Sequence, residues 1–471
     1  MPIGKDDYIV ITPDGYYYGT RNSLKGIGYK FGKQFISPEQ FDLRFNRPDI
    51  VLSRLGYVSP VVVRSYLRAY QKRLQRLNFT EDQLDKQIHL PAISLLSNQL
   101  PLVTKQPTLK FNVRTVDNLF NIDRINIVVN SVPVYGSKGI VLTDRMSGDI
   151  TVPIQIELTP GRNKIQVSCL NEKGVESLPE NFEIEYTVSR EQRNLYLVAI
   201  SVSEYNNSKM NLKYSVKDGR DIVKLFSRKT ENYHQIFVDT IFNKSATKHN
   251  ILAIKEKLMK SHPDDEVILY ISGHGLLDKK FDFYFGTYDL DFSDPALNGV
   301  KYEDLENLLD GIGARHKLLL MDACHSGEVD KTTLQVEASQ SVALSTGQRG
   351  SIKSYSYPLE TTEENYRVGI TTSFELMQEL FSNVNRGSGT VVISAAAGNS
   401  YALESDEWHN GVFTYSIING LRNKAADKNR DGHVSVSELK DFVSREVERL
   451  TKGQQRPTSR NEYIEFDFKI W

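Results

Sequence analysis

Two polar segments of this chain each follow a run of apolar residues. The segment EVILYISGHG ends with His274 between two glycines, and HKLLLMDACHSG carries Cys324 just after its apolar run. A cysteine thiol has a pKa near ~8.5, so at neutral pH it needs a histidine within hydrogen-bond reach to act as a nucleophile. We therefore predict that Cys324 is a nucleophile and that His274 is its general base and acid.

The histidine next to the thiol in sequence, His325, is a poor base for Cys324. Adjacent residues of an extended strand point to opposite faces, so we expect His325 to brace the loop or to be exposed. The glycines around His274 would let a substrate backbone lie close to the imidazole. We expect the developing oxyanion to be stabilised by backbone amides, those of Gly275 and of the turn that begins at Cys324.

Strands and helices alternate from residue 194 to the end of the chain at 471, and this pattern predicts one α/β domain. Near-continuous apolar strands between helices are typical of a mostly parallel sheet covered on both faces. In such sheets, catalytic groups gather at the carboxyl ends of the strands. The expected strands are 194–202, 234–242, 266–273, 281–289, 316–323 and 390–397, and the expected helices are 214–228, 246–260, 301–310 and a group after 411.

The segments SGHG and DACHSG resemble those of caspase-like cysteine peptidases, most closely the metacaspases and their bacterial relatives. The resemblance covers roughly 194–445, and the fifty residues between His274 and Cys324 match the caspase spacing. It implies a caspase-hemoglobinase α/β fold and a cysteine endopeptidase that forms a thioester acyl-enzyme. It also implies protein or peptide substrates, and no cofactor is required for that chemistry.

An acid, Asp322, stands where the caspase pattern has a glutamine before Ala-Cys. The resemblance to metacaspases implies a pocket for a basic side chain, in which Asp322 and Asp218 are the acids and Ser215 and Ser272 are lining hydroxyls. Two carboxylates pair well with one guanidinium or ammonium group, which predicts cleavage after Arg or Lys. The alternative is an ordinary structural role for each residue, loop capping in the case of Asp322.

The segment 331–366 is rich in Ser, Thr, Gln and Glu and lacks apolar periodicity, which predicts a mobile loop after the nucleophile. In caspase-like proteins the chain divides here into a large and a small part, often by self-cleavage. An uncut loop is the alternative. The basic residues at which such an enzyme would cut itself are Lys331, Arg349 and Lys353. The later loop 396–408 is expected to form a wall of the substrate groove, with Glu404 and Trp408 as contacts.

The segment DKNRDGHVSVSE at 427–438 fits the pattern of a calcium-binding loop. It stands without a partner loop, and a helix that begins near Ser435 would use the same side chains as caps. Calcium binding with a regulatory role and helix capping are therefore both open interpretations. The ligand positions would be Asp427, Asn429, Asp431, His433 and Glu438.

Three further regions precede the α/β domain. Residues 1–56 are rich in Tyr and Gly and predict short strands; they resemble the stretch that follows the last blade of bacterial β-propellers, as a remnant or an edge. Residues 57–87 have helical spacing, with Thr80 as an N-cap, and predict a helical connector. Residues 88–190 alternate with a period of two and predict an immunoglobulin-like β-sandwich, in which Cys169 is a core residue. The sandwich would bind a regulatory protein or act as a spacer.

The overall composition is that of a folded protein of two to four domains, with 471 residues, 39% hydrophobic residues and a net charge of −1. Without a basic excess, neither nucleic acid nor an anionic membrane is expected as a partner. No apolar run reaches the ~18 residues of a membrane span, and MPIGKDDYIV lacks the features of a secretory signal. Two cysteines indicate a reducing, cytoplasmic setting.

Two other functions stay open beside that of an endopeptidase. A catalytically silent interaction module is the first, and the presence of both His274 and Cys324 argues against it. A transpeptidase or ligase that uses the same thioester is the second. Product analysis with an added amine would distinguish it from a hydrolase.

Overall fold

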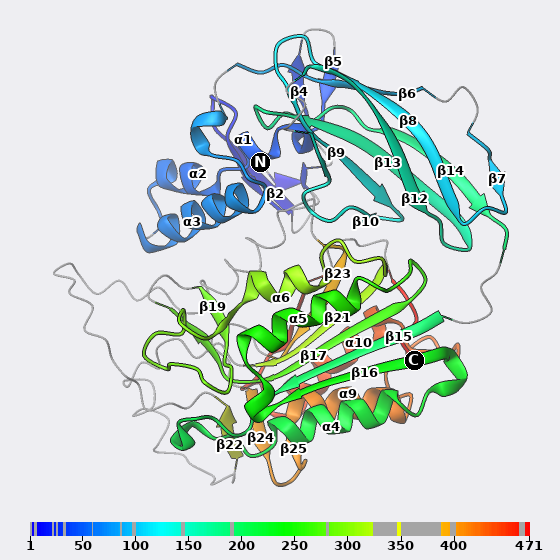
Figure 1. The fold of residues 1–471 in the computed structure, drawn as a ribbon. Coiled ribbons are helices and arrows are strands. Elements are labelled where there is room, and N and C mark those ends of the chain that lie inside the picture. The colour runs from blue at the N-terminus through cyan, green and yellow to red at the C-terminus, as the bar shows by residue number, and fades with distance from the viewer. Residues whose placement is uncertain are drawn as a thin grey trace. The chain divides into compact units, whose positions relative to one another are not determined.

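The computed structural model describes most of the chain as two compact units (Figure 1). The units are Met1–Arg190 with Tyr366–Gly389, and Glu191–Asn365 with Thr390–Trp471. The described residues are 2–3, 7–20, 23–24, 27–31, 34–58, 60–84, 87–96, 100–142, 147–188, 193–278, 282–323, 346–349, 388–395, 402–460 and 467–471. Cys324, His325, Lys331 and Lys353 therefore lie outside the described residues. In the described part, no helix is long and apolar enough to span a membrane.

The first unit begins with short strands and three helices. Sequence patterns predicted only strands and turns before residue 56, but two helices form there. Pro48 is the first residue of α2, where its missing N–H and fixed φ favour a helix start. The helix expected after Thr80 is a single 3-10 turn. The elements are β1 (Pro2–Ile3), β2 (Asp7–Ile11), β3 (Tyr17–Gly19), β4 (Tyr29–Phe31), β5 (Gln34–Ile36), α1 (Asp42–Phe45), α2 (Pro48–Leu55), α3 (Pro60–Arg76) and η3 (Glu81–Gln83).

The rest of the first unit is two β-sheets with one core between them. Burial alternates along the strands, as in β12, because the pleat sends successive side chains to opposite faces. Cys169 is fully buried in this core, and burial raises the pKa of its thiol to about 12. One sheet has the order β12-β8-β6 and the other β10-β9-β13-β14-β7, with β11 on β9. The strands are β6 (Ala92–Leu95), β7 (Val103–Thr104), β8 (Thr108–Val116), β9 (Ile122–Val129), β10 (Val132–Pro133), β11 (Ile140–Val141), β12 (Asp149–Glu157), β13 (Gly161–Asn171) and β14 (Glu180–Tyr186).

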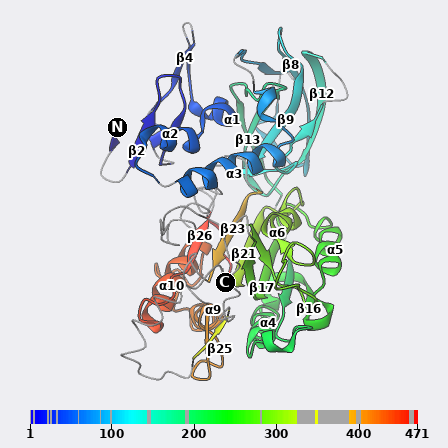
Figure 2. The same cartoon turned by 90° about the vertical axis from the view of Figure 1, so that its left-hand side faces the viewer.

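The second unit is built on a six-stranded sheet of order β16-β15-β17-β21-β23-β26. Its first five strands are parallel and β26 is antiparallel, so the predicted mostly parallel sheet is present. Helices α5 and α6 lie on one side of the sheet and α9 and α10 on the other (Figure 2). The elements are β15 (Arg193–Ser201), α4 (Ser215–Phe226), β16 (Tyr233–Phe242), α5 (Lys248–Leu258), β17 (Glu266–Gly273), α6 (Tyr302–Leu309), β21 (His316–Ala323), β23 (Thr390–Ser394), α9 (Val412–Arg422), α10 (Val436–Leu450) and β26 (Thr458–Arg460).

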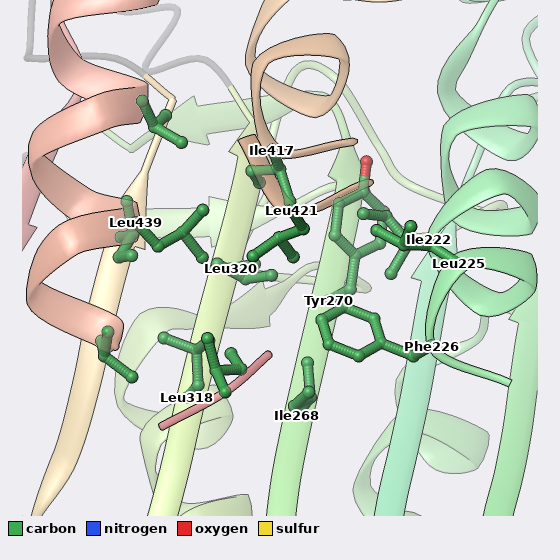
Figure 3. Packing of buried hydrophobic residues seen from close by; sticks show 14 of the residues in the cluster. Ile222, Leu225, Phe226, Ile268, Tyr270, Leu318, Leu320, Ile417, Leu421 and Leu439 are labelled. Atoms are coloured by element: carbon green, nitrogen blue, oxygen red, sulfur yellow. The ribbon is translucent and has the colours of Figure 1, made fainter. Parts of the chain in front are cut away.

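The core on one face of this sheet fixes which side chains of β17 and β21 share a face. Ile268 and Tyr270 of β17 and Leu318 and Leu320 of β21 pack there against α4, α9 and α10 (Figure 3). Because the side-chain period of a strand is two, Ser272 and Asp322 are placed on this same face, each one residue before the end of its strand. The helix residues labelled in the figure are Ile222, Leu225, Phe226, Ile417, Leu421 and Leu439.

The described residues of the second unit also form two small sheets. The first has the order β18-β19-β20 and the second β22-β24-β25. Gly275, directly after His274, begins the first of them and pairs with Phe285. The strands are β18 (Gly275–Leu277), β19 (Phe283–Phe285), β20 (Val300–Lys301), β22 (Thr346–Arg349), β24 (Ala402–Ser405) and β25 (Asn410–Gly411).

Candidate active site

The two strands that precede His274 and Cys324 are direct neighbours. β17 and β21 pair in parallel, and Gly273 is the register partner of Ala323. Paired strands lie about 4.8 Å apart. The residues that precede the predicted base and the predicted nucleophile are therefore aligned at the same edge of the sheet. Cys324 itself lies outside the described residues.

His274 is held at both its backbone and its ring, and its side chain is buried. The backbone N–H donates to the Tyr205 hydroxyl at 2.8 Å, and Nε2 lies 2.8 Å from the carbonyl oxygen of Met210. A carbonyl oxygen only accepts hydrogen bonds, so this contact assigns the proton of the neutral ring to Nε2. Nδ1 then carries the lone pair of the neutral imidazole. Nδ1 is thus the nitrogen suited to take a proton from a thiol.

Gly273 is required by the close approach of two aromatic side chains. A Cβ at this position would lie 2.9 Å from the Tyr205 hydroxyl and 3.1 Å from the Phe285 ring. Both distances are shorter than an ordinary van der Waals contact, so a larger residue would displace the segment that carries His274. The role of Gly275 as an oxyanion donor, like that of Cys324, stays a prediction.

Three of the four predicted pocket residues lie together at the end of the sheet. Ser201, Ser272 and Asp322 are aligned across β15, β17 and β21. Ser215, the first residue of α4, has its hydroxyl 2.7 Å from the Ser272 carbonyl oxygen and 3.0 Å from the Ser272 hydroxyl. The side chains of these three residues and of Ser215 are fully buried. The structure thus gathers Ser215, Ser272 and Asp322 beside the strand ends.

Asp322 accepts a hydrogen bond from the first turn of α9. The Thr414 hydroxyl donates to Oδ2 of Asp322 at 2.6 Å, and it lies 2.7 Å from the Tyr270 hydroxyl. Since Thr414 has one proton to donate, Tyr270 must be the donor to Thr414. This Tyr270–Thr414–Asp322 chain is buried throughout. Neither Thr414 nor Tyr270 stands in a recognisable sequence motif, so neither was predicted.

Asp218 contacts the same helix terminus from α4. The Gly411 N–H lies 3.2 Å from each carboxylate oxygen of Asp218, and Gly411 is the N-cap residue of α9. The Asn410 side-chain amide donates to Asp218 at 2.7 Å and lies 3.0 Å from Asp221. A helix N-terminus favours negative charge. The two predicted pocket acids, Asp218 and Asp322, therefore meet at the N-terminus of α9, where each also has a structural role.

The segment after β23 is fastened to the start of α4. The Glu404 carboxylate accepts the backbone N–H groups of Lys213 at 3.1 Å and Tyr214 at 3.3 Å, and Glu404 is buried. Asp406 accepts hydrogen bonds from the side chains of the same two residues. Trp408 packs against the core. Glu404, expected as a substrate contact, thus holds two backbone amides in the structure.

Of the three predicted self-cleavage residues, only Arg349 lies within the described part of the chain. It is the last residue of β22, and its backbone position pairs with Ala402 of β24 in an antiparallel ladder. Proteases bind segments whose backbone groups are available for strand pairing. Cleavage after Arg349 would therefore require β22 to separate from β24.

The predicted calcium loop is closed by hydrogen bonds between carboxylates and backbone amides. Glu438 accepts the N–H groups of Lys428 and Asn429 at 3.0 Å each, and the N–H of Ser435 at 3.0 Å in a capping box that begins α10. Asp427 accepts the N–H of Gly432 at 3.0 Å. Among the described residues, no three His, Cys, Asp or Glu side chains are grouped to hold a metal ion. These hydrogen bonds are those of a helix cap, and calcium binding at this loop stays a prediction.

Comparison with known proteins identifies the family. The model of the caspase domain family matches residues 196–468, more than half of the chain, and the chain belongs to this family. The match begins near the predicted boundary and extends beyond residue 445 to include β26. A caspase domain indicates a cysteine-type peptidase with protein substrates.

Two further searches complete the comparison. No curated protein matches this chain. Among solved structures, the chain is similar to a protein from Geobacter sulfurreducens, with 18% sequence identity and a TM-score of 0.37. That match covers 57% of this chain and 92% of the other.

Proposed function

We propose that this protein is a cysteine endopeptidase that hydrolyses peptide bonds after Arg or Lys, with His274 and Cys324 as its catalytic pair. The observation that carries the proposal is the alignment of Gly273 with Ala323 on neighbouring strands. His274 and Cys324 directly follow these two residues in the sequence. The contact between His274 Nε2 and the Met210 carbonyl oxygen also supports the proposal. This contact places the ring proton on Nε2, so Nδ1 is the nitrogen that can act as a base.

The reaction follows from these assignments. His274 Nδ1 takes the proton of the Cys324 thiol, and the thiolate attacks the substrate carbonyl carbon to give a tetrahedral oxyanion. The oxyanion collapses to a thioester as the C–N bond breaks, and His274 gives its proton to the leaving amine. His274 then takes a proton from water, which attacks the thioester and releases the acid and the thiol. The amides of Gly275 and Cys324 are the proposed oxyanion donors.

The preference for Arg or Lys rests on Asp218 and Asp322. Both are buried acids at the N-terminus of α9, and Ser215 and Ser272 lie beside Asp322. A basic substrate side chain offers several N–H donors to such carboxylates. An aspartate side chain would instead meet two like charges.

Three features of the whole protein belong to the same proposal. Self-processing would occur in 331–366, at Lys331, Arg349 or Lys353. The two-sheet sandwich of the first unit, an immunoglobulin-like domain in this proposal, would bind a regulatory protein. The cytoplasm is the proposed setting, because two cysteines in 471 residues suit a reducing compartment.

Fluorogenic peptides test the proposal. Peptides that end in Arg or Lys should be hydrolysed and their Asp-ending twin should not, with Cys324→Ala as the blank. Cys169→Ser is the matched control, because it removes the other thiol, which is buried in the sandwich core, and it should keep the activity. Cleavage of the Asp-ending peptide in preference would overturn the specificity. Full activity of Cys324→Ala would overturn the mechanism.

A further inference from the structure

One loop contacts His274 at two points. Residues 202–214 connect β15 to α4, and Tyr205 and Met210 both belong to this loop. The Tyr205 hydroxyl accepts the His274 backbone N–H at 2.8 Å, and the Met210 carbonyl oxygen lies 2.8 Å from His274 Nε2. The loop therefore fixes the backbone of His274 with a side chain and its ring with a main-chain carbonyl.

Tyr205 also packs against the imidazole. Its ring centroid lies 4.9 Å from that of His274, and the Phe292 ring lies 5.5 Å from each of them. Tyr205 is 4% exposed. Its hydroxyl occupies the space that a Cβ at residue 273 would need, at 2.9 Å. The glycine before His274 and the tyrosine hydroxyl thus fit each other sterically.

The loop that carries Tyr205 is itself fastened by asparagine side chains. Asn211 Oδ1 accepts the Tyr205 N–H at 2.8 Å. Asn243 Oδ1 accepts the N–H groups of Ser203 at 2.9 Å and Glu204 at 3.1 Å. Contacts of this kind restrict the backbone on both sides of Tyr205. Its hydroxyl is therefore held in place by a preorganised loop.

We propose that Tyr205 is a positioning residue for His274. It does not touch the substrate; it fixes the backbone of His274 so that Nε2–H stays on the Met210 carbonyl and Nδ1 keeps the lone pair that the proposed base needs. This inference rests on the proposed peptidase function and adds a residue to it that no motif contains. Without the hydroxyl, the backbone N–H of His274 would lose this hydrogen bond, and the imidazole would be held less firmly in its working position.

The test is Tyr205→Phe, which removes the hydroxyl and keeps the ring. We expect kcat to fall about tenfold while KM stays within about twofold, because orientation in the transition state changes and substrate binding does not. Histidine-labelled protein gives a second readout by ¹⁵N NMR, with His274→Ala to assign the signal among nine histidines. The wild type should show the Nε2–H tautomer, and Tyr205→Phe should show a mixture of the two tautomers.

Tyr233→Phe is the matched control. Tyr233 is also 4% exposed, and its hydroxyl donates to Glu266 at 3.1 Å, at the opposite end of the sheet. The Tyr233→Phe variant should lose about as much stability as Tyr205→Phe, but it should keep the kcat of the wild type.

The proposal is overturned if Tyr205→Phe keeps both kcat and the Nε2–H tautomer. It is also overturned if both tyrosine variants lose activity only in step with their folded fraction. If the wild type hydrolyses no peptide but Tyr205→Phe still mixes the tautomers, the positioning role stands and the peptidase proposal fails.

Discussion

At the scale of single residues, the two acids proposed to select the substrate also support the fold. Asp322 accepts the Thr414 hydroxyl, and Asp218 accepts the Gly411 N–H, so both stabilise the N-terminus of α9. If these acids also bind the substrate, the proposed basic-residue pocket is coupled to helix α9, which begins beside it. A substitution that tests substrate binding must therefore remove the charge of the carboxylate and keep an oxygen that accepts the structural hydrogen bond.

Asp322→Asn is such a substitution, because its amide oxygen can still accept the Thr414 hydroxyl. We expect kcat/KM for peptides ending in Arg or Lys to fall about 100-fold, since a buried charge pair is lost. A peptide ending in citrulline should not lose rate. Asp406→Asn, which removes an exposed acid bound to Lys213, serves as the control and should change kcat/KM less than about threefold. Equal losses for the charged and the neutral peptide would show that Asp322 acts only through the fold.

Residues near the active site differ in how far sequence alone could predict them. His274 follows an apolar strand and stands between glycines, so its place at the sheet edge was predictable. The contacts of Tyr205 and Met210 with His274 were not predictable. Tyr205 is far from His274 in sequence, and Met210 contacts it through a main-chain carbonyl that any residue would supply. Thr414 was missed for the same reason, since its partner Asp322 lies on another element.

At the scale of elements, the strands buried on both faces were the most predictable part. β15, β17 and β21 are continuous apolar runs, and their predicted ranges agree with the structure to within about two residues. The short polar strand β26 was not predicted, because it is held by pairing with β23 and not by its own apolar pattern. Helix α1 was missed because its four residues are too few to show helical periodicity.

The start of α10 separates the two interpretations of the segment 427–438. If Glu438 acts as a cap, Glu438→Ala removes the acceptor of three backbone N–H groups and costs about 2 kcal/mol of stability. The midpoint of thermal unfolding should then fall by about 4 °C, and by the same amount in calcium and in excess chelator. A loss that appears only in calcium would favour a metal ligand. Lys440→Ala, further along the same helix, is the control and should change the midpoint by less than about 1 °C.

At the scale of the whole molecule, Glu266 is buried and His316 is half-buried at the end of the sheet opposite to His274. Burial raises the pKa of Glu266 to about 7, and the Arg193 guanidinium, 3.1 Å away, opposes this shift. Burial lowers the pKa of its register partner His316 to about 4. The stability contributed by His316 is present above its ordinary pKa of 6.5 and is lost as the pH falls toward 4. As the pH falls from 7 toward 4, the protein therefore gains stability from Glu266 and loses stability from His316.

Glu266→Gln isolates one of these groups. The folded-state pKa of Glu266 is raised above its ordinary value of 4.5, so its contribution is full below pH 4.5 and is lost as the pH rises through 7. Urea unfolding of both proteins should show the variant gaining about 3 kcal/mol relative to wild type between pH 4.5 and 7.5. Tyr233→Phe, which removes a hydrogen bond to Glu266 without removing the acid, is the comparison. A difference independent of pH would mean that Glu266 is ionised throughout this range.

In the proposed mechanism, Cys324 is activated by His274 and attacks a carbonyl carbon after a basic residue. A peptidyl-Arg acyloxymethyl ketone tests it most directly, because the reagent alkylates an active-site thiolate and mass spectrometry locates the adduct. Only two cysteines are present, and Cys169 is buried with a pKa raised to about 12. We predict one adduct per chain, on Cys324, that is lost in His274→Ala and is absent with the Asp reagent. An unmodified Cys324, or equal labelling by the Asp reagent, would contradict the account.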